Sequence, residues 1–214
     1  MSPYVPCARG DALLLTRGRT GSADDLLLIS SAVVLDGVLG GHIHVTGHRK
    51  LGIERRRIAP GPAREGAPAL MEALRRQVVA VAGDTPWGWF ERVSVYALKR
   101  ATDELVDAGV AVRFRPDPLR RLFPHPTLNV DPDAHAAARE RLADVLTGGR
   151  AAPHAIALAS ALHACDRLDD VAGLRLGRRQ LRAMTDAARS LGSGPQAVLA
   201  VLQERRSRAD GIAA

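Results

Sequence analysis

Residues 26–43 read LLLISSAVVLDGVLGGHI, a strongly apolar run that closes on a pair of glycines. Such a run is typical of a helix that is buried on all sides. Asp24 or Asp25 stands where a carboxylate caps the first turn of a helix. We expect Gly40 and Gly41 to end this helix.

A short hairpin is predicted to follow the helix. Residues 42–45 alternate as a strand does, and Thr46-Gly47 is a turn signal. Residues 51–58 then return as the second strand, before Pro60 and Pro62 break the chain.

Helical periodicity dominates the remaining sequence. Residues 10–16 open the domain with an apolar turn, and residues 110–130 predict a second hairpin with an apolar, proline-marked tip. Apolar residues recur at helical spacing in the segments 67–82, 87–108, 133–147, 153–172, 175–191 and 195–206. We therefore predict a mainly α fold in a single domain over residues 10–206, with flexible termini at 1–9 and 207–214.

The composition is that of a chain with one sizeable aliphatic core. Hydrophobic residues make up 46% of the 214 residues, and aromatic residues only 3%.

Cys7 and Cys165 lack paired spacing, which favours a reducing compartment over a disulfide framework. The apolar runs fall short of the ~18 residues that span a bilayer, and no signal-peptide pattern opens the sequence. We expect a soluble, cytoplasmic protein.

The charge balance calls for an acidic partner. The formal net charge is +7, which favours binding to nucleic acid or to an anionic membrane surface. Arginine far outnumbers lysine, since Lys50 and Lys99 are the only lysines. Coding bias in a GC-rich genome is one explanation of that preference, but it does not explain the net positive charge.

Several motifs in collinear order resemble the Golgi phosphoprotein 3 family, in particular its bacterial, actinobacterial members. The matching stretches are ALLLT at 12–16, AVVLDGVLGGHIHV at 32–45, LKRATDELVDAGVAVRF at 98–114, LFPHPTLNVDPDAHAAARERLADVLTGG at 122–149 and ALASALHACDRL at 157–168. The resemblance implies a compact helical-bundle domain with two short β-hairpins, one of them protruding. It also implies a peripheral membrane protein that binds a phosphoinositide-type head group and acts as an adaptor for client membrane proteins.

The phosphoinositide pocket of the family does not transfer residue by residue. Its tryptophan and its three basic residues fall near Gly21 and at Ser30, Val95 and Leu98, none of which carries a charge. Lys99 and Arg100 follow directly, so a shifted head-group site at these two residues is the prediction that the resemblance leaves.

The tip of the second hairpin combines apolar and basic residues. Leu119, Leu122 and Phe123 are flanked by Arg120 and Arg121. This pattern favours insertion into a membrane interface, where each arginine gains about 1 kcal/mol from anionic lipid. Packing of the same apolar residues on the core, or in a homo-oligomer, is the alternative.

A second basic run, Arg55-Arg56-Arg57, lies beside the first hairpin. On a strand Arg55 and Arg57 share one face, which predicts a phosphate-attracting strip; a solvated charge run is the alternative. His42, His44 and His48 admit a zinc site, but no carboxylate or thiol lies at ligand spacing, and we predict no metal and no cofactor.

The sequence contains no motif that identifies an enzyme. A nucleophile motif, a P-loop and a glycine-rich dinucleotide signature are all missing from it, so we predict no catalytic residue. An enzyme or small-molecule-binding protein of a specialised pathway, built on the same scaffold, remains one alternative. A helix-plus-wing nucleic-acid-binding protein is another, which the few base-reading residues of helix 87–108 disfavour.

Overall fold

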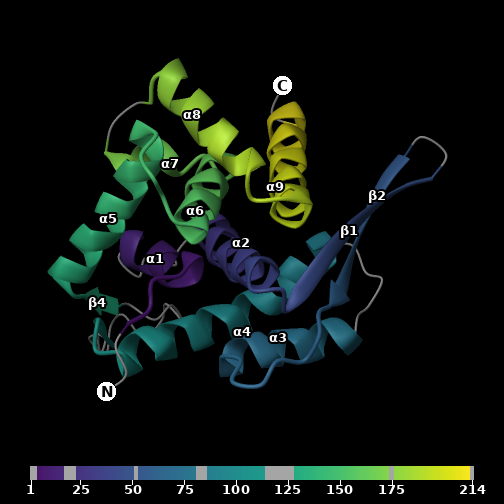
Figure 1. Ribbon diagram of the computed structural model, residues 1–214, viewed down its shortest axis with the longest axis horizontal. Coiled ribbons are helices and arrows are strands. Elements are labelled where there is room, and N and C mark those ends of the chain that lie inside the picture. Colours follow the sequence, from purple (N-terminus) through teal and green to yellow (C-terminus); the bar gives the residue numbers. More distant parts are fainter. Residues whose placement is uncertain are drawn as a thin grey trace.

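The computed structural model describes residues 4–16, 23–50, 53–80, 86–113, 128–173 and 176–212. Within them the chain is mainly helical, with two antiparallel two-stranded sheets, which confirms the predicted fold class (Figure 1). The elements are α1 Ala8–Leu15, α2 Ala23–Leu39, β1 Ile43–Lys50, β2 Ile53–Pro60, α3 Ala69–Ala80, α4 Pro86–Asp107, β3 Ala111–Arg113, β4 Leu128–Val130, α5 Pro132–Thr147, α6 Pro153–Ala164, α7 Leu168–Ala172, α8 Arg178–Arg189 and α9 Ser193–Ile212.

Helix α2 is the centre of the fold, as its apolar sequence predicts. It packs against α1, α4, α6 and α9, which surround it in Figure 1. Its apolar side chains are fully buried from Leu28 to Leu35. The two buried serines in this stretch donate their hydroxyls to carbonyls one turn earlier, Ser30 to Leu26 and Ser31 to Leu27. These bonds satisfy the only polar side-chain groups that the middle of α2 places in the core.

The amino-terminal segment differs from the prediction. Residues 10–16 do not form an isolated turn, because α1 starts at Ala8 and its residues are buried throughout. In the segment before α1, the Tyr4 hydroxyl donates to Asp11 Oδ1 at 2.9 Å. Periodicity over so few residues does not distinguish one helical turn from two, and packing on α2 decides the outcome.

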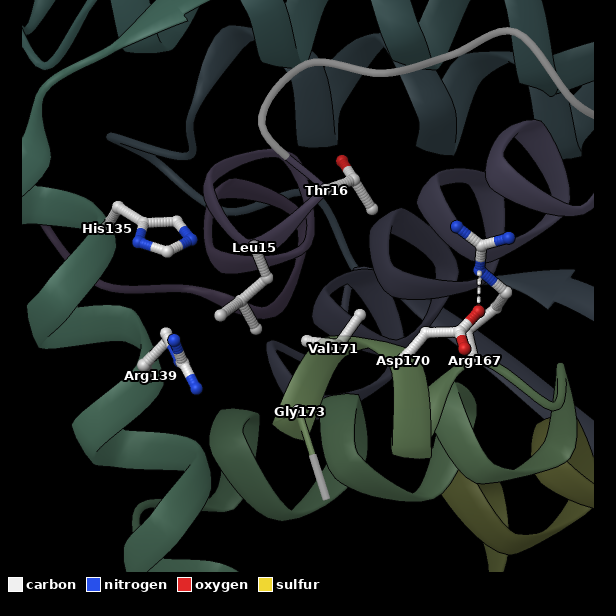
Figure 2. Close-up of a pocket in the computed structure, with 8 residues that line it drawn as sticks. All are labelled: Leu15, Thr16, His135, Arg139, Arg167, Asp170, Val171 and Gly173. Carbon is white, nitrogen blue, oxygen red and sulfur yellow. Dashed lines mark ion pairs between the residues drawn. The ribbon is translucent and has the colours of Figure 1, made fainter. Parts of the chain in front are cut away.

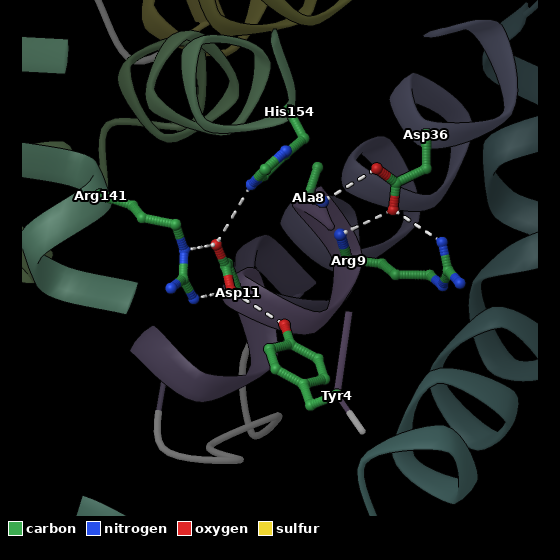
Figure 3. A network of polar contacts seen from close by, with 7 residues as sticks. All are labelled: Tyr4, Ala8, Arg9, Asp11, Asp36, Arg141 and His154. Carbon is green, nitrogen blue, oxygen red and sulfur yellow. Dashed lines mark hydrogen bonds and ion pairs between the residues drawn. The ribbon is translucent and has the colours of Figure 1, made fainter. Parts of the chain in front are cut away.

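A carboxylate of the central helix caps α1 from outside. The backbone amides of Ala8 and Arg9 donate to the two oxygens of Asp36 at 2.8 and 3.0 Å. The Arg9 guanidinium also reaches Asp36, at 3.0 Å, and donates through Nε to Glu104 of α4 at 2.8 Å. Figure 3 shows Asp36 between the first turn of α1 and the Arg9 side chain. One carboxylate thus joins α1 to α2, and Arg9 extends the link to α4.

The first hairpin is longer than predicted. Strand β1 continues to Lys50 and pairs with β2 from Ile43↔Pro60 to Lys50↔Ile53, so Thr46-Gly47 lies within a strand and the predicted turn is wrong. This hairpin stands out from the helices in Figure 1. The second hairpin begins where predicted, with Ala111–Arg113 paired to Leu128–Val130. At the base of the first one, a side chain on Gly61 would collide with the Gly41 carbonyl, so the close approach requires glycine.

Two further helix predictions are corrected. The segment 153–172 forms α6 and α7, because Asp166 takes a left-handed conformation with φ of 57° and interrupts the helix. At the other end of the chain, the helix predicted over 195–206 is longer, because α9 runs from Ser193 to Ile212. Asp25 does not cap α2 but lies within its first turn, buried, where Arg167 approaches it at 3.1 Å.

In the described parts of the chain no helix is long and apolar enough to cross a membrane.

The Asp36 cap predicts a large stability effect. We expect Asp36→Ala to lower the free energy of unfolding by about 3 kcal/mol, because it leaves the buried Arg9 charge with one carboxylate and frees two helix amides. Urea unfolding followed by circular dichroism measures this. The exposed pair Arg189–Asp186 is the matched control, and Asp186→Ala should cost less than about 1 kcal/mol. Equal losses in the two variants would contradict the structural role of Asp36.

Candidate functional site

The β1–β2 hairpin gathers basic residues on one face through strand alternation. Directly opposed residues of an antiparallel pair share a face. We define the outer face by the opposed pairs His44↔Ala59, Thr46↔Arg57, His48↔Arg55 and Lys50↔Ile53. It holds five basic positions and, within these described strands, no acidic one. His44 and Arg57 are exposed to solvent.

The opposite face of the hairpin holds it against the body. Val45 and Ile58 oppose each other there and are buried in the core. Arg56 lies on the same face and forms an ion pair with Glu204 of α9. Glu54, the only acidic residue of the two described strands, is opposite Arg49 on this face as well. The arginine run is therefore divided, with Arg56 used structurally and its two neighbours placed on the outer face.

The predicted head-group residues lie on two different elements. Arg55 and Arg57 belong to β2, whereas Lys99 and Arg100 lie on the exposed side of α4. The Arg100 guanidinium lies over the Tyr96 ring, 5.6 Å from its centroid, which holds it along the helix surface. The predicted head-group residues therefore belong to two separate basic surfaces. The outer face of the hairpin holds more basic residues than the pair on α4 does.

Two positions equivalent to the phosphoinositide pocket face the core. Ser30 is fully buried and its hydroxyl is engaged with the Leu26 carbonyl, while Leu98 is 6% exposed. Neither can bind a phosphate from its present place. The other two positions cannot be compared, because Gly21 and the Val95 side chain lie outside the described residues.

The predicted membrane-inserting tip lies outside the described residues. Leu119, Arg120, Arg121, Leu122 and Phe123 all belong to the segment 114–127 between β3 and β4. The base of that hairpin is described, and there Arg113 forms an ion pair with Asp103 of α4. Insertion of the tip stays a prediction.

The histidines at the start of the first hairpin do not share a face. His42 precedes β1 and is 8% exposed, whereas His44 is exposed on the outer face. These two imidazoles therefore do not lie together as a zinc site at His42, His44 and His48 would require, because β1 begins only at Ile43. No group of three histidine, cysteine or acidic side chains suited to a metal ion occurs among the residues that the structure describes.

Two cavities open on the described surface. One, of about 350 Å³, lies between the end of α1, α5 and α7, and Figure 2 shows Arg139 and Arg167 on opposite sides of it. Arg167 is balanced by buried Asp25 at 3.1 Å and approaches Asp170 at 4.0 Å, so this cavity has no clear excess of positive charge. The other, of about 530 Å³, lies between the amino-terminal segment and α4. Sequence reasoning missed both, because their walls come from segments far apart in the chain.

Besides Asp36, the buried carboxylate of Asp11 belongs to the surroundings of the larger cavity, because it accepts a hydrogen bond from Tyr4, which lines that cavity. Asp11 is 1% exposed and receives two hydrogen bonds from the Arg141 guanidinium, at 2.8 and 2.6 Å (Figure 3). His154 Nε2 lies 3.9 Å from the same carboxylate. Burial and the adjacent Asp11 raise the pKa of Tyr4, which keeps its hydroxyl protonated as a donor. The network neutralises Asp11 and anchors the Tyr4 ring beside the cavity.

The comparison with family models identifies one match over most of the chain. The model described as Golgi phosphoprotein 3 (GPP34) matches residues 12–205. No curated protein matches the chain.

The base of the first hairpin gives a testable pH dependence. Burial, and next the positive charge of Arg64, lower the pKa of His42 below its ordinary value of 6.5. The unfolded state therefore binds the proton first, and the contribution of His42 makes stability fall as the pH drops from about 6.5 towards the lowered value. In a proton NMR titration we expect the His42 midpoint below 6.5, and Arg64→Gln should raise it. A midpoint unchanged by that substitution would contradict the assigned cause.

Proposed function

The chain belongs to the Golgi phosphoprotein 3 family, and from that premise we propose that it is a peripheral membrane protein that binds anionic lipid. The observation that carries the proposal is the outer face of the β1–β2 hairpin, where His44, His48, Lys50, Arg55 and Arg57 share one side. The head group bound there is defined by charge rather than by the phosphoinositide pocket of the family, since Ser30 and Leu98 are buried.

The charge on this face is sufficient for reversible membrane binding. Lysine or arginine near an anionic bilayer gains about 1 kcal/mol, so the three permanent cations of the outer face supply about 3 kcal/mol. That energy corresponds to roughly a hundredfold enrichment at the membrane. The hairpin protrudes from the helices (Figure 1), and this protrusion supports its contact with a flat membrane surface.

The apolar tip of the second hairpin completes the proposed attachment. Leu119, Leu122 and Phe123 insert at the interface, and Arg120 and Arg121 remain at the level of the phosphates. Two weak signals of different kinds, charge and apolar burial, give more stable anchoring together than either gives alone. An adaptor role follows, in which the attached protein positions client membrane proteins.

Charge reversal on the outer face tests the proposal. The assay is co-sedimentation with vesicles of neutral phosphatidylcholine, alone or with phosphatidylglycerol, cardiolipin or phosphatidylinositol 4-phosphate, at two salt concentrations. We expect salt-sensitive binding to all anionic vesicles. Arg55→Glu/Arg57→Glu should reduce it about thirtyfold or more, because two attractions of about 1 kcal/mol each are lost.

A matched variant controls for net charge. Arg179→Glu/Arg182→Glu makes the same charge change at exposed positions of α8, and it should retain most of the binding. Lys99→Glu/Arg100→Glu tests the basic pair of α4 in the same way, and Leu122→Asp/Phe123→Asp tests the tip. If neutral and anionic vesicles sediment equally little protein, membrane binding is wrong. A mobility shift of random duplex DNA at the same salt would then favour the nucleic-acid alternative.

A further inference from the structure

The larger cavity has the size and lining of a small-molecule site. Its volume of about 530 Å³ falls in the range of ligand pockets in proteins. Most of its wall is apolar, and the residues that form it are Tyr4, Val5, Cys7, Arg9, Gly10, Pro68, Ala101, Glu104, Leu105, Asp107 and Ala108. The amino-terminal segment and the carboxyl-terminal half of α4 are thus its two main walls.

The polar groups of this wall are dominated by negative charge. Glu104 and Asp107 are three residues apart on α4, which places them on the same side of the helix. Arg9, the one cation among the described lining residues, is shared between Glu104 and the buried carboxylate of Asp36. Within the wall itself, the carboxylates of Glu104 and Asp107 exceed the one guanidinium by one charge, and Asp36 outside the wall offsets Arg9 further. The carboxyl-terminal end of α4, at Asp107, adds the negative end of its helix dipole.

Among the described residues that line the cavity, no other group offsets this excess. Burial, and next the charge of Asp36, raise the pKa of Cys7 to about 12, so its thiol stays protonated and neutral. Tyr4 is neutral for the same kind of reason, with its hydroxyl committed to Asp11. The positive amino-terminal end of α1 is already neutralised by Asp36.

We infer that this cavity binds a small organic cation with a short alkyl chain, such as an alkylguanidinium or an alkylammonium ion. The alkyl chain contacts the apolar wall around Ala101 and Leu105, and the cationic head lies at Glu104 and Asp107. A carboxylate or phosphate ligand is disfavoured here by the same charges. The inference does not depend on membrane binding, because the cavity uses none of the residues of the outer face of the hairpin.

Isothermal titration calorimetry and thermal unfolding of the full chain test the inference. The probes are pentylguanidinium and pentylammonium, with 1-pentanol as the neutral match and pentanoate as the anionic one. We expect saturable binding of both cations, with a midpoint of unfolding that rises with their concentration. The alcohol should bind at least about tenfold more weakly, and pentanoate should not bind.

Three variants locate the site. Asp107→Asn removes an exposed charge and should weaken cation binding about two- to fivefold while leaving the unliganded midpoint of unfolding nearly unchanged. Ala108→Phe fills the cavity without a change of charge and should abolish binding. Glu140→Gln removes an equally exposed carboxylate of α5 and should leave the affinity at the wild-type value.

The outcomes separate a site from general attraction to acidic groups. Failure of both cations to bind, or equal affinity for cation and alcohol, would overturn the inference. So would wild-type affinity in Asp107→Asn or Ala108→Phe. An equal loss in Glu140→Gln and Asp107→Asn would show diffuse attraction in place of a site.

Discussion

The Asp36 carboxylate is the constraint on which the rest of the architecture depends. It is borne by the central helix α2 and accepts from the first amides of α1, so the amino-terminal turn acquires a cap that its own sequence does not supply. Through Arg9 it also reaches Glu104, which links α4 to α1 and α2. Burying these charges is costly, and the cost is offset because both Asp36 oxygens and the Nε and Nη1 atoms of Arg9 have defined partners. Apolar packing is not directional, so these polar contacts favour one arrangement of α1, α2 and α4 over others.

Both proposed activities lie at the margins of this core. The hairpin is held by Val45 and Ile58 in the core and by the Arg56–Glu204 ion pair, which leaves its other face available for a polyanion. The larger cavity lies where α1 and α4 diverge beside the Arg9 network. Opposite electrostatic characters therefore occur in one chain, a basic strip on a protruding hairpin and an acidic cavity in the body. The net charge of +7 agrees in sign with the basic strip, but it gives no indication of the acidic cavity.

The sequence was informative where one residue pattern had one structural meaning. The apolar run from Leu28 to Leu35 predicts a buried helix correctly, and the split of Arg55 and Arg57 from Arg56 follows from strand alternation. It failed where distant residues decide. The helix at Ala8 depends on Asp36, and the break at Asp166 needs a left-handed residue that helical periodicity does not reveal. The cavity walls could not be predicted for the same reason, since Val5 and Asp107 meet only after folding.

Strand alternation in β2 also limits how the hairpin can change over generations. Inserting or deleting one residue between Ile53 and Ile58 would exchange its two faces, turning Arg55 and Arg57 towards α9 and Ile58 towards water. A lineage can therefore alter the charge of the outer face only by substitution at alternate positions, while the length of the strand stays fixed. Length variation should accumulate instead between the two strands, at residues 51 and 52, where it leaves the pairing of the strands intact.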